Sequence, residues 1–245
     1  MEYKEDITEK KTLWDSHCHT NFEIICILEG DITVTVEGRK FHLSDNQIII
    51  LPPMCFHTIS SNSRMRYRRI TGLFEKTEIP EEIYEPLSRD LLKNPVITHT
   101  DIPNILSQLL YSIDKPYCAP LQKSLLVQIF YIALQKADQV YAKEPSSQIS
   151  AILQYIDANI CKLITLEDIS KNTYISQSTI SHLFVREMKA TVKQYILQKK
   201  LAYAEDLIQS GENPTEVSLK IGYGNYSNFY RIYRKFYGKS PSGKD

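Results

Sequence analysis

The 245-residue sequence lacks the features that would assign it to several classes of protein. Its five cysteines are odd in number and scattered without a CxxC pair, which argues against a disulfide framework and suits reduced thiols in a cytosol. The charged start has no apolar stretch of the signal-peptide type, and no run approaches the roughly 20 apolar residues that span a bilayer. We find no P-loop, no dinucleotide-binding motif and no internal repeat. We therefore expect a cytoplasmic protein with no membrane partner.

The sequence also lacks a net charge, since 29 Lys+Arg balance 29 Asp+Glu. The charges are unevenly distributed, because the part from Ser146 onward has 13 Lys+Arg against 9 Asp+Glu. A basic C-terminal part gives mild support for a polyanionic partner there. An uneven solvated surface would explain the same counts equally well.

What the first part of the chain does contain is a series of short β-forming runs. They are rich in β-branched and aromatic residues, each of the first four ends at Gly, Ser or Pro, and they cover 22–30, 31–38, 39–44, 46–53 and 66–74. Many short strands with turn signals predict an all-β barrel or sandwich. We assign residues 1–75 to this barrel.

A helical pattern replaces the strands after Ile79. It covers 102–113 and 119–142, and the second stretch carries a broad apolar stripe. A helix this apolar is expected to bury one face on its own domain and another on a partner, which suggests a homodimer, although burial wholly within one chain remains open. We assign 76–142 to a helical dimerisation and linking segment, and the Pro- and Ser-containing stretch 143–147 to a linker.

The remaining residues, 148–245, are predicted to be all-helical and contain a first helix-turn-helix pattern. Thr165 begins one helix with Asp168 three positions later, and Ser176 begins the next. The second helix has a buried apolar stripe and a polar outer face, which suits insertion into a DNA major groove. The residues on that outer face are Gln177, Ser178, Ser181, His182 and Arg186.

A second copy of the pattern follows. Gly222 suits the left-handed position that ends a helix, Asn225 suits the start of the next, and Leu219 is assigned to the core. The outward residues near the start of the second helix, where base edges are read, are Tyr226, Ser227, Asn228 and Arg231. By its chemistry Arg231 suits guanine and Asn228 suits adenine. Arg234 and Lys235 suit phosphates, which set position rather than sequence.

These C-terminal motifs resemble the AraC/XylS family of bacterial transcription regulators. The resemblance is carried by "KLAYAEDLI" (200–208), "IGYGNYSNFYRIYRKFYG" (221–238) and the "KSP" that follows, and it covers about 149–241. It implies two helix-turn-helix units joined by a long helix, here predicted over 191–209. It also implies double-stranded DNA, a small-molecule effector and RNA polymerase as partners, with activation the commoner outcome.

The N-terminal part then resembles the cupin-type sensor barrel of the same family. His17, His19 and Glu23 match the spacing of the first cupin motif, and His57 belongs to the second, although Asn46 and Met54 stand where that motif has glycines. The resemblance implies that the three histidines and the glutamate either hold one divalent ion, such as Zn, Fe, Mn or Ni, or line a polar pocket without metal. The residues predicted to border the effector site are Trp14, His17, His19, Phe22, Glu23 and His57.

Two functions remain open from the sequence. The first is a DNA-binding transcriptional regulator that is controlled by a small molecule in the cupin pocket, and the family resemblance implies that it activates. The second is a metal-dependent cupin enzyme fused to a DNA-binding domain. No catalytic acid or base pair can be placed, so the regulator is the prediction and the enzyme is the alternative.

Overall fold

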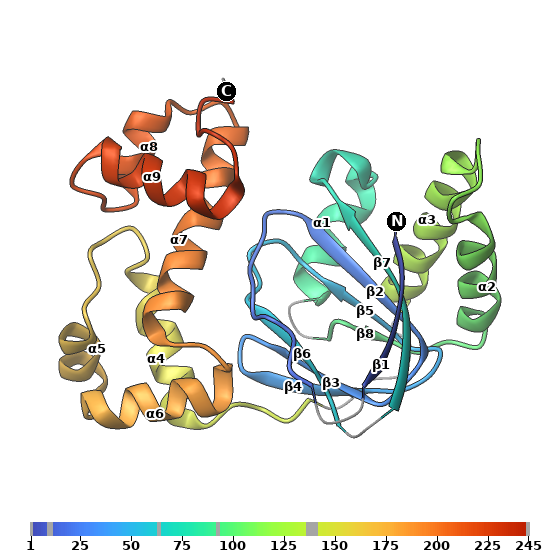
Figure 1. The fold of residues 1–245 in the computed structure, drawn as a ribbon, viewed down its shortest axis with the longest axis horizontal. Coiled ribbons are helices and arrows are strands. Elements are labelled where there is room, and N and C mark those ends of the chain that lie inside the picture. The colour runs from blue at the N-terminus through green and yellow to red at the C-terminus, as the bar shows by residue number, and fades with distance from the viewer. Residues whose placement is uncertain (1, 9–11, 63–64, 92–93, 136–141, 244–245) are drawn as a thin grey trace. The chain divides into compact units, whose positions relative to one another are not determined.

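The computed structural model describes residues 2–8, 12–62, 65–91, 94–135 and 142–243. Contacts divide the chain into two units, which we describe separately (Figure 1). The first unit contains Met1–Asp15 and Asn21–Glu144, and the second contains Ser16–Thr20 and Pro145–Asp245. Within the described residues, no helix has both the length and the apolar character needed to span a membrane.

Two antiparallel sheets form the first unit. The larger has the order β1-β7-β2-β5-β8, with strands at Glu2–Thr8, Met65–Phe74, Phe22–Glu29, Ile48–Leu51 and Val96–Ile97. The smaller has the order β4-β3-β6, with strands at Arg39–Leu43, Ile32–Val36 and His57–Ser61.

Strand β2 is buried on both faces, and its alternation divides the core in two. Ile25 and Ile27 belong to a cluster with residues of the smaller sheet, such as Val34. Phe22 and Cys26 point the other way, into a cluster with the helices. The interior between the two sheets is therefore largely aliphatic, and Glu23, on the same face as Ile25, points toward it.

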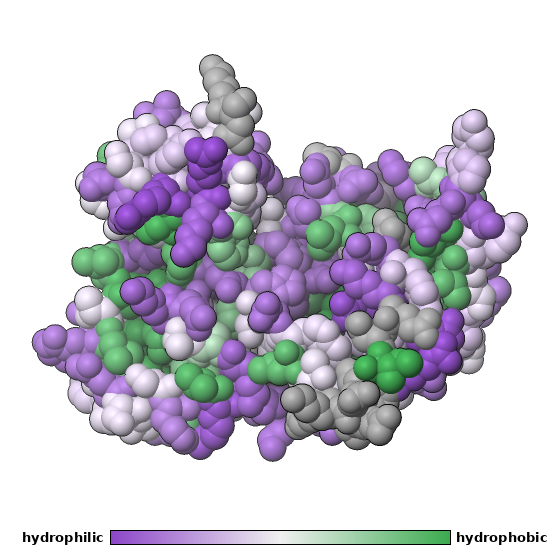
Figure 2. Space-filling model, viewed as in Figure 1, coloured by the Kyte–Doolittle hydropathy of each residue, from purple (hydrophilic) through white to green (hydrophobic). Residues whose placement is uncertain are grey.

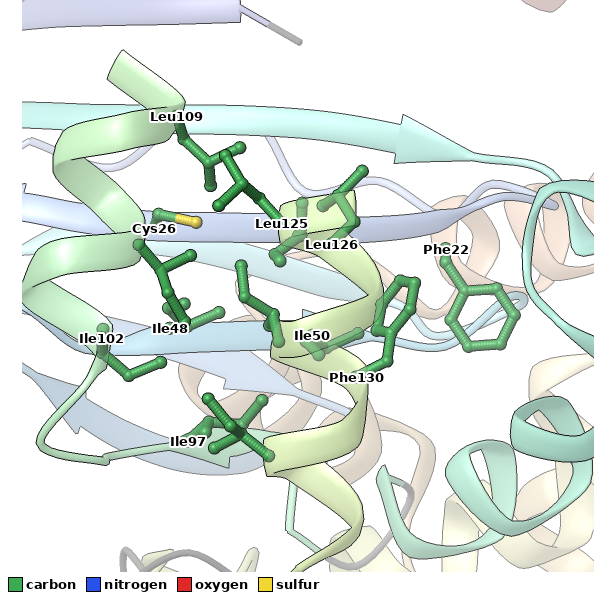
Figure 3. Close-up of a cluster of buried hydrophobic side chains, with 14 of the residues drawn as sticks. Phe22, Cys26, Ile48, Ile50, Ile97, Ile102, Leu109, Leu125, Leu126 and Phe130 are labelled. Carbon is green, nitrogen blue, oxygen red and sulfur yellow. The ribbon is translucent and has the colours of Figure 1, made fainter. Parts of the chain in front are cut away.

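Three helices cover the outer face of the larger sheet: α1 (Glu81–Leu91), α2 (Ile102–Ser112) and α3 (Ala119–Leu134). Figure 3 shows Leu109 of α2 and Phe130 of α3 among the side chains of this sheet. Helix α3 buries its Leu125, Leu126, Ile129, Phe130 and Ile132 within the chain. It leaves Leu121, Val127 and Tyr131 exposed.

The predicted class, a β-barrel with appended helices followed by an all-helical domain, is confirmed. Three strands lie outside the sequence-predicted set. Strand β1 lies in the charged start, and β6 lies between the predicted runs 46–53 and 66–74. Strand β8 lies inside 76–142, so that segment also contributes to the barrel. The helix predicted over 119–142 ends at Leu134 in the structure, and 136–141 lie outside the described residues.

The second unit is built from helices, apart from its short stretch Ser16–Thr20. It contains α4 (Ser147–Ala158), the pair α5 (Leu166–Thr173) and α6 (Gln177–Met188), the long α7 (Val192–Gln209), and the pair α8 (Pro214–Lys220) and α9 (Tyr226–Tyr237). Helix α7 joins the two pairs, as predicted for 191–209. It begins with a capping box between Thr191 and Gln194.

The stretch 143–147, predicted as a linker, is held at both ends. The backbones of Lys143 and Lys40 exchange two hydrogen bonds, and Glu144 pairs with Arg39 at 2.9 Å. On the other side, the Ser146 hydroxyl accepts from the amide of Ile149 and caps α4. The contact units divide between Glu144 and Pro145.

Candidate DNA-reading and effector sites

The first helix pair is fixed by side-chain caps at both starts. Thr165 accepts from the amide of Asp168 at 3.1 Å, and the Asp168 carboxylate accepts from the amide of Thr165 at 2.9 Å. The Thr165 hydroxyl also donates to the Asp168 carboxylate, and this bond, followed by the one from the Thr165 amide, lowers the pKa of Asp168 below its ordinary value. Tyr174 takes a left-handed conformation in the turn, with φ +58°. The Ser176 hydroxyl then accepts from the amide of Thr179 at 3.1 Å and starts α6.

Helix α6 buries an apolar stripe and exposes every residue predicted to read DNA. The buried residues are Ile180, Leu183, Phe184 and Met188. The exposed ones are Gln177, Ser178, Ser181, His182 and Arg186. Two of these are already engaged, because Ser181 donates to the carbonyl of Gln177 and Arg186 contacts Glu187 at 2.7 Å. The outer face of α6 is thus polar, and most of its side chains are small.

The second pair repeats this design with different turn chemistry. Asn213 caps α8 by accepting from the amide of Thr215 at 2.9 Å. Gly222 follows the helix with φ +81°, and Asn225 caps α9 by accepting from the amide of Asn228 at 2.8 Å.

Helix α9 buries Phe229 and Tyr233. Its exposed residues include Ser227, Asn228, Arg231, Arg234 and Lys235. Arg231 donates to the side chain of Asn228 at 3.2 Å, so these two predicted base readers lie together on one face.

Two sequence predictions need correction in this pair. Leu219 is 62% exposed and lies outside the core, whereas Ser218 is buried and donates to the carbonyl of Thr215. Tyr226 is only half-exposed, because its ring packs against Phe229 with centroids 6.1 Å apart. Burial raises the pKa of Tyr226, so its ring serves the core as well as the surface.

The two reading helices are directly comparable, because each has twelve residues and starts at a capping residue. By position, His182 of α6 corresponds to Arg231 of α9, and Arg186 corresponds to Lys235. At the position shared by His182 and Arg231, the second copy therefore carries the larger side chain, a guanidinium group that is permanently charged.

Sequence reasoning missed a buried carboxylate, Glu205 of α7, which is 4% exposed. It accepts hydrogen bonds from the Tyr233 hydroxyl, from Lys239 at 2.8 Å and from Gln209 at 2.8 Å. Burial, and secondarily the charge of Glu205, raise the pKa of the nearby Tyr237. Glu205 therefore ties the connector helix to α9 and to the residues that follow it.

In the first unit, Glu23 of β2 and His57 of β6 meet on the inner side of the barrel. The His57 Nε2 atom lies 2.9 Å from a Glu23 carboxylate oxygen, and the imidazole is fully buried. The other ring nitrogen, Nδ1, lies 3.0 Å from the carbonyl oxygen of Cys55. Since a carbonyl only accepts, Nδ1 is the donor there, which fixes the ring and turns Nε2 toward Glu23.

The four predicted ligand residues fall in both contact units. Glu23 and His57 form the pair just described in the first unit. His17 and His19 lie in Ser16–Thr20, which groups with the second unit, and their ring centroids are 5.6 Å apart. The turns of the second motif also take the required shape without glycine, since Asn46 and Met54 have φ of +60° and +66°.

The remaining predicted pocket residues divide. Trp14 is half-buried at the edge of the inner cluster, with its ring 5.3 Å from that of Tyr67. Phe22 was predicted on the wrong face. It lies opposite to Glu23 on β2, among the residues covered by the helices, and is fully buried there (Figure 3).

Comparisons with known proteins agree with this two-part architecture. A family model described as the AraC-like ligand binding domain matches residues 5–130, and one described as a helix-turn-helix domain matches 169–243. The probable transcriptional regulator LumQ of Photobacterium leiognathi is 24% identical over 92% of this chain and 90% of its own length. The lactose operon transcription activator of Staphylococcus xylosus is 21% identical over 88% and 80%. The solved structure of unsaturated fatty acid bound wild-type ToxT from Vibrio cholerae has 12% identity and a TM-score of 0.43, and the match covers 98% of this chain and 92% of that one.

Proposed function

We propose, since this chain belongs to the AraC family of transcriptional regulators, that it activates transcription by reading two successive major-groove segments of DNA with α6 and α9. The protein is a regulator that combines a ligand-binding domain with a DNA-binding domain. The observation that carries the finer proposal is the repetition of one design. Two capped twelve-residue helices each bury an apolar stripe and expose a polar face, and one continuous helix joins their units.

The roles proposed for individual residues follow their chemistry. Arg231 and Asn228 read base edges, with Ser227 and the exposed edge of Tyr226 beside them. Arg234, Lys235 and Arg186 contact phosphates, which fix the register of the protein on the duplex. Gln177, Ser178, Ser181 and His182 contribute smaller contacts from α6.

Selection from duplexes with a randomised central segment tests this proposal. Wild-type protein should enrich two conserved sequence blocks with centres about one helical turn apart. Enrichment of no sequence, at low and at physiological salt, would contradict sequence-specific reading. A single enriched block would leave one of the two helices without a reading role.

We further propose that the regulator acts as a homodimer in the cytoplasm, where its DNA lies, and that it recruits RNA polymerase. Leu121, Val127 and Tyr131 form an exposed apolar set on α3 that a second copy could cover. Sedimentation of the wild type and of Val127→Glu tests the dimer, because a charge at the interface should shift the variant toward monomer. An unchanged sedimentation coefficient would place the dimer contact elsewhere. The name of the lactose operon relative supports activation, and a reporter gene tests it.

For the effector we propose a divalent metal ion held by His17, His19, Glu23 and His57. Three imidazoles and one carboxylate are a donor set that zinc and iron accept. The contact of His57 Nδ1 with the Cys55 carbonyl supports this, because ligating histidines commonly donate their second nitrogen to such a group. The alternative is that these side chains line a polar pocket for an organic effector.

Metal analysis of untagged protein separates the two readings. Stoichiometric metal in the wild type, lost in His57→Ala and in Glu23→Gln but kept in the control His99→Ala, would support the metal effector. Its removal should then change the affinity for the selected DNA. Absence of metal after loading with zinc, iron or manganese would favour the alternative, in which these side chains line a polar pocket for an organic effector. The metal-cupin enzyme alternative receives no support from the relatives, which are transcription regulators.

A further inference from the structure

The two helix-turn-helix units of the second domain touch each other at a joint on α7. At its centre is Lys200, a charged residue of the connector that is only 6% exposed. Its ammonium group donates to the carbonyl of Lys162 at 2.6 Å and to that of Ile221 at 2.7 Å. Lys162 lies in the loop between α4 and α5, which leads into the first helix-turn-helix. Ile221 follows the last residue of α8 in the second helix-turn-helix. One side chain therefore holds the backbone of both units.

Gly222 allows the two backbones to approach this closely. A Cβ atom there would lie 3.0 Å from the carbonyl oxygen of Cys161, 3.0 Å from the carbonyl carbon of Lys162 and 3.2 Å from the nitrogen of Leu163. These are backbone atoms, which cannot swing aside as the end of a flexible side chain can. The positive φ of Gly222 also disfavours any other residue. The loop of one unit thus packs directly on the turn of the other.

The buried ammonium makes this joint specific. Its burial lowers the pKa of Lys200, because the charged form loses solvent. Two carbonyl oxygens compensate for that loss, and they are correctly placed only while both loops keep their positions. A movement of either unit would leave the ammonium with an incomplete set of partners.

The joint lies between the two reading helices. Lys200 and Gly222 line a groove of about 700 Å³ in this unit, together with Ser181 of α6 and Asn228 of α9. Figure 2 shows hydrophobic side chains reaching the surface of the unit between the α5–α6 pair and the α8–α9 pair. Both walls of the groove thus carry residues proposed to face DNA, and its lining includes the joint.

We propose that Lys200 and Gly222 are positioning residues that hold the two helix-turn-helix units at one separation. The protein then binds its two DNA blocks at one fixed spacing. This rests on the proposed reading of DNA by α6 and α9. Without the joint, the two helix-turn-helix units would be connected mainly through α7, and each could tilt on its end of that helix. A locked pair binds a correctly spaced site with the advantage of a preorganised bivalent ligand. It loses this advantage when the spacing is wrong.

The test measures tolerance to spacing rather than affinity alone. The probes are the duplex enriched by wild-type protein and the same duplex with two base pairs inserted between its blocks. For the wild type we expect the insertion to weaken binding by about ten-fold or more, since one contact set is lost. Lys200→Met keeps a side chain of similar length but removes its hydrogen-bond donors. For this variant the loss of affinity caused by the insertion should fall to below about three-fold, and the correctly spaced site should be bound less tightly. Lys200→Arg should restore the wild-type ratio, because it keeps donors at the same place.

Two further variants keep the outcome decisive. Lys193→Met, an exposed lysine of the same groove, is the matched control and should keep the wild-type ratio. Gly222→Ala should show the same reduced insertion penalty as Lys200→Met. If Lys200→Met loses its helicity, the ratio of the affinities of Gly222→Ala for the two duplexes tests the joint instead. A full insertion penalty in folded Lys200→Met or Gly222→Ala would overturn the joint while leaving DNA reading intact. Failure of the wild type to enrich any sequence would instead overturn the proposed function.

Discussion

The two helix-turn-helix copies have the same length and capping pattern but differ in what they bury and what they expose. The first has a mixed interior, in which Ile180 and Leu183 lie with the ring of Phe184, and small outward residues, and its arginine, Arg186, is paired with Glu187. The second has an aromatic interior around Phe229 and exposes Arg231, Arg234 and Lys235. A duplicated scaffold has thus been specialised. We interpret the second copy as the main reader of sequence and the first as the copy that sets position.

The largest expected effect tests the two interiors. Phe229→Ala removes a fully buried ring that packs against Tyr223 and Tyr233, and should lower the free energy of unfolding by about 3–5 kcal/mol. The equivalent aliphatic change, Ile180→Ala, should lower it by about 2–5 kcal/mol, toward the lower end. Urea unfolding of both variants measures the difference. A larger loss for Ile180→Ala would mean that the aromatic cluster is not the more demanding interior.

The next effect tests the two reading faces at matched positions. Arg231→Ala should cost about 1–3 kcal/mol of binding to the selected site and little on random DNA. His182→Ala, at the same position of α6, should cost less on the selected site. Titration of both variants on both duplexes decides this. Equal losses of Arg231→Ala on selected and random DNA would reduce Arg231 to a phosphate contact.

A smaller effect distinguishes the caps of the two copies. Thr165→Ala removes the side-chain cap of α5 and should cost about 0.5–2 kcal/mol of stability, as should Asn213→Ala in α8. Only the first cap contains a titratable partner, Asp168. Because folding lowers the pKa of Asp168, its carboxylate stabilises the fold above its unfolded pKa, and this contribution disappears as the pH falls through the folded value. Melting curves should therefore show that the loss of stability of Asp168→Ala, relative to the wild type, disappears at acid pH. The loss in Asn213→Ala should show no such dependence on pH.

The smallest effect concerns phosphate contacts. Lys235→Ala should weaken binding to all sequences alike and reduce the slope of log affinity against log salt by about 1. Arg186→Ala should change the slope less, because Glu187 already competes for its guanidinium. If Arg186→Ala gives the larger change, the first copy carries more of the electrostatic binding than its surface suggests.

The parts of this molecule that could be predicted from sequence are those fixed by local signals. Thr165, Ser176 and Asn225 were each recognised as helix starts, and each accepts the capping hydrogen bond expected of it. The outward residues of α6 followed from helical periodicity alone. Such features need only a few neighbouring residues, so no knowledge of the tertiary structure was required.

The errors arose where the tertiary partner decides the outcome. Strand β2 is apolar on both faces, so alternation could not tell that Phe22 faces the helices and Glu23 the interior. Strand β8 has two residues and shows no period, and its pairing with β5 alone defines it. Lys200 and Glu205 look like the solvated face of α7 in the sequence, and only the neighbouring loops and Tyr233 reveal them as buried. Long-range contacts carry the information that local patterns lack.

The network around Glu205 also determines where this domain can be cut. By secondary structure a fragment could end at Gly238, which closes α9. Such a fragment would lose Lys239, whose ammonium group contacts the buried Glu205 carboxylate at 2.8 Å. It would also lose Ser240 and Pro241, both of which are buried. The shortest fragment fit for crystallisation or for fusion to another sensor therefore extends past the last helix, to Pro241 at least.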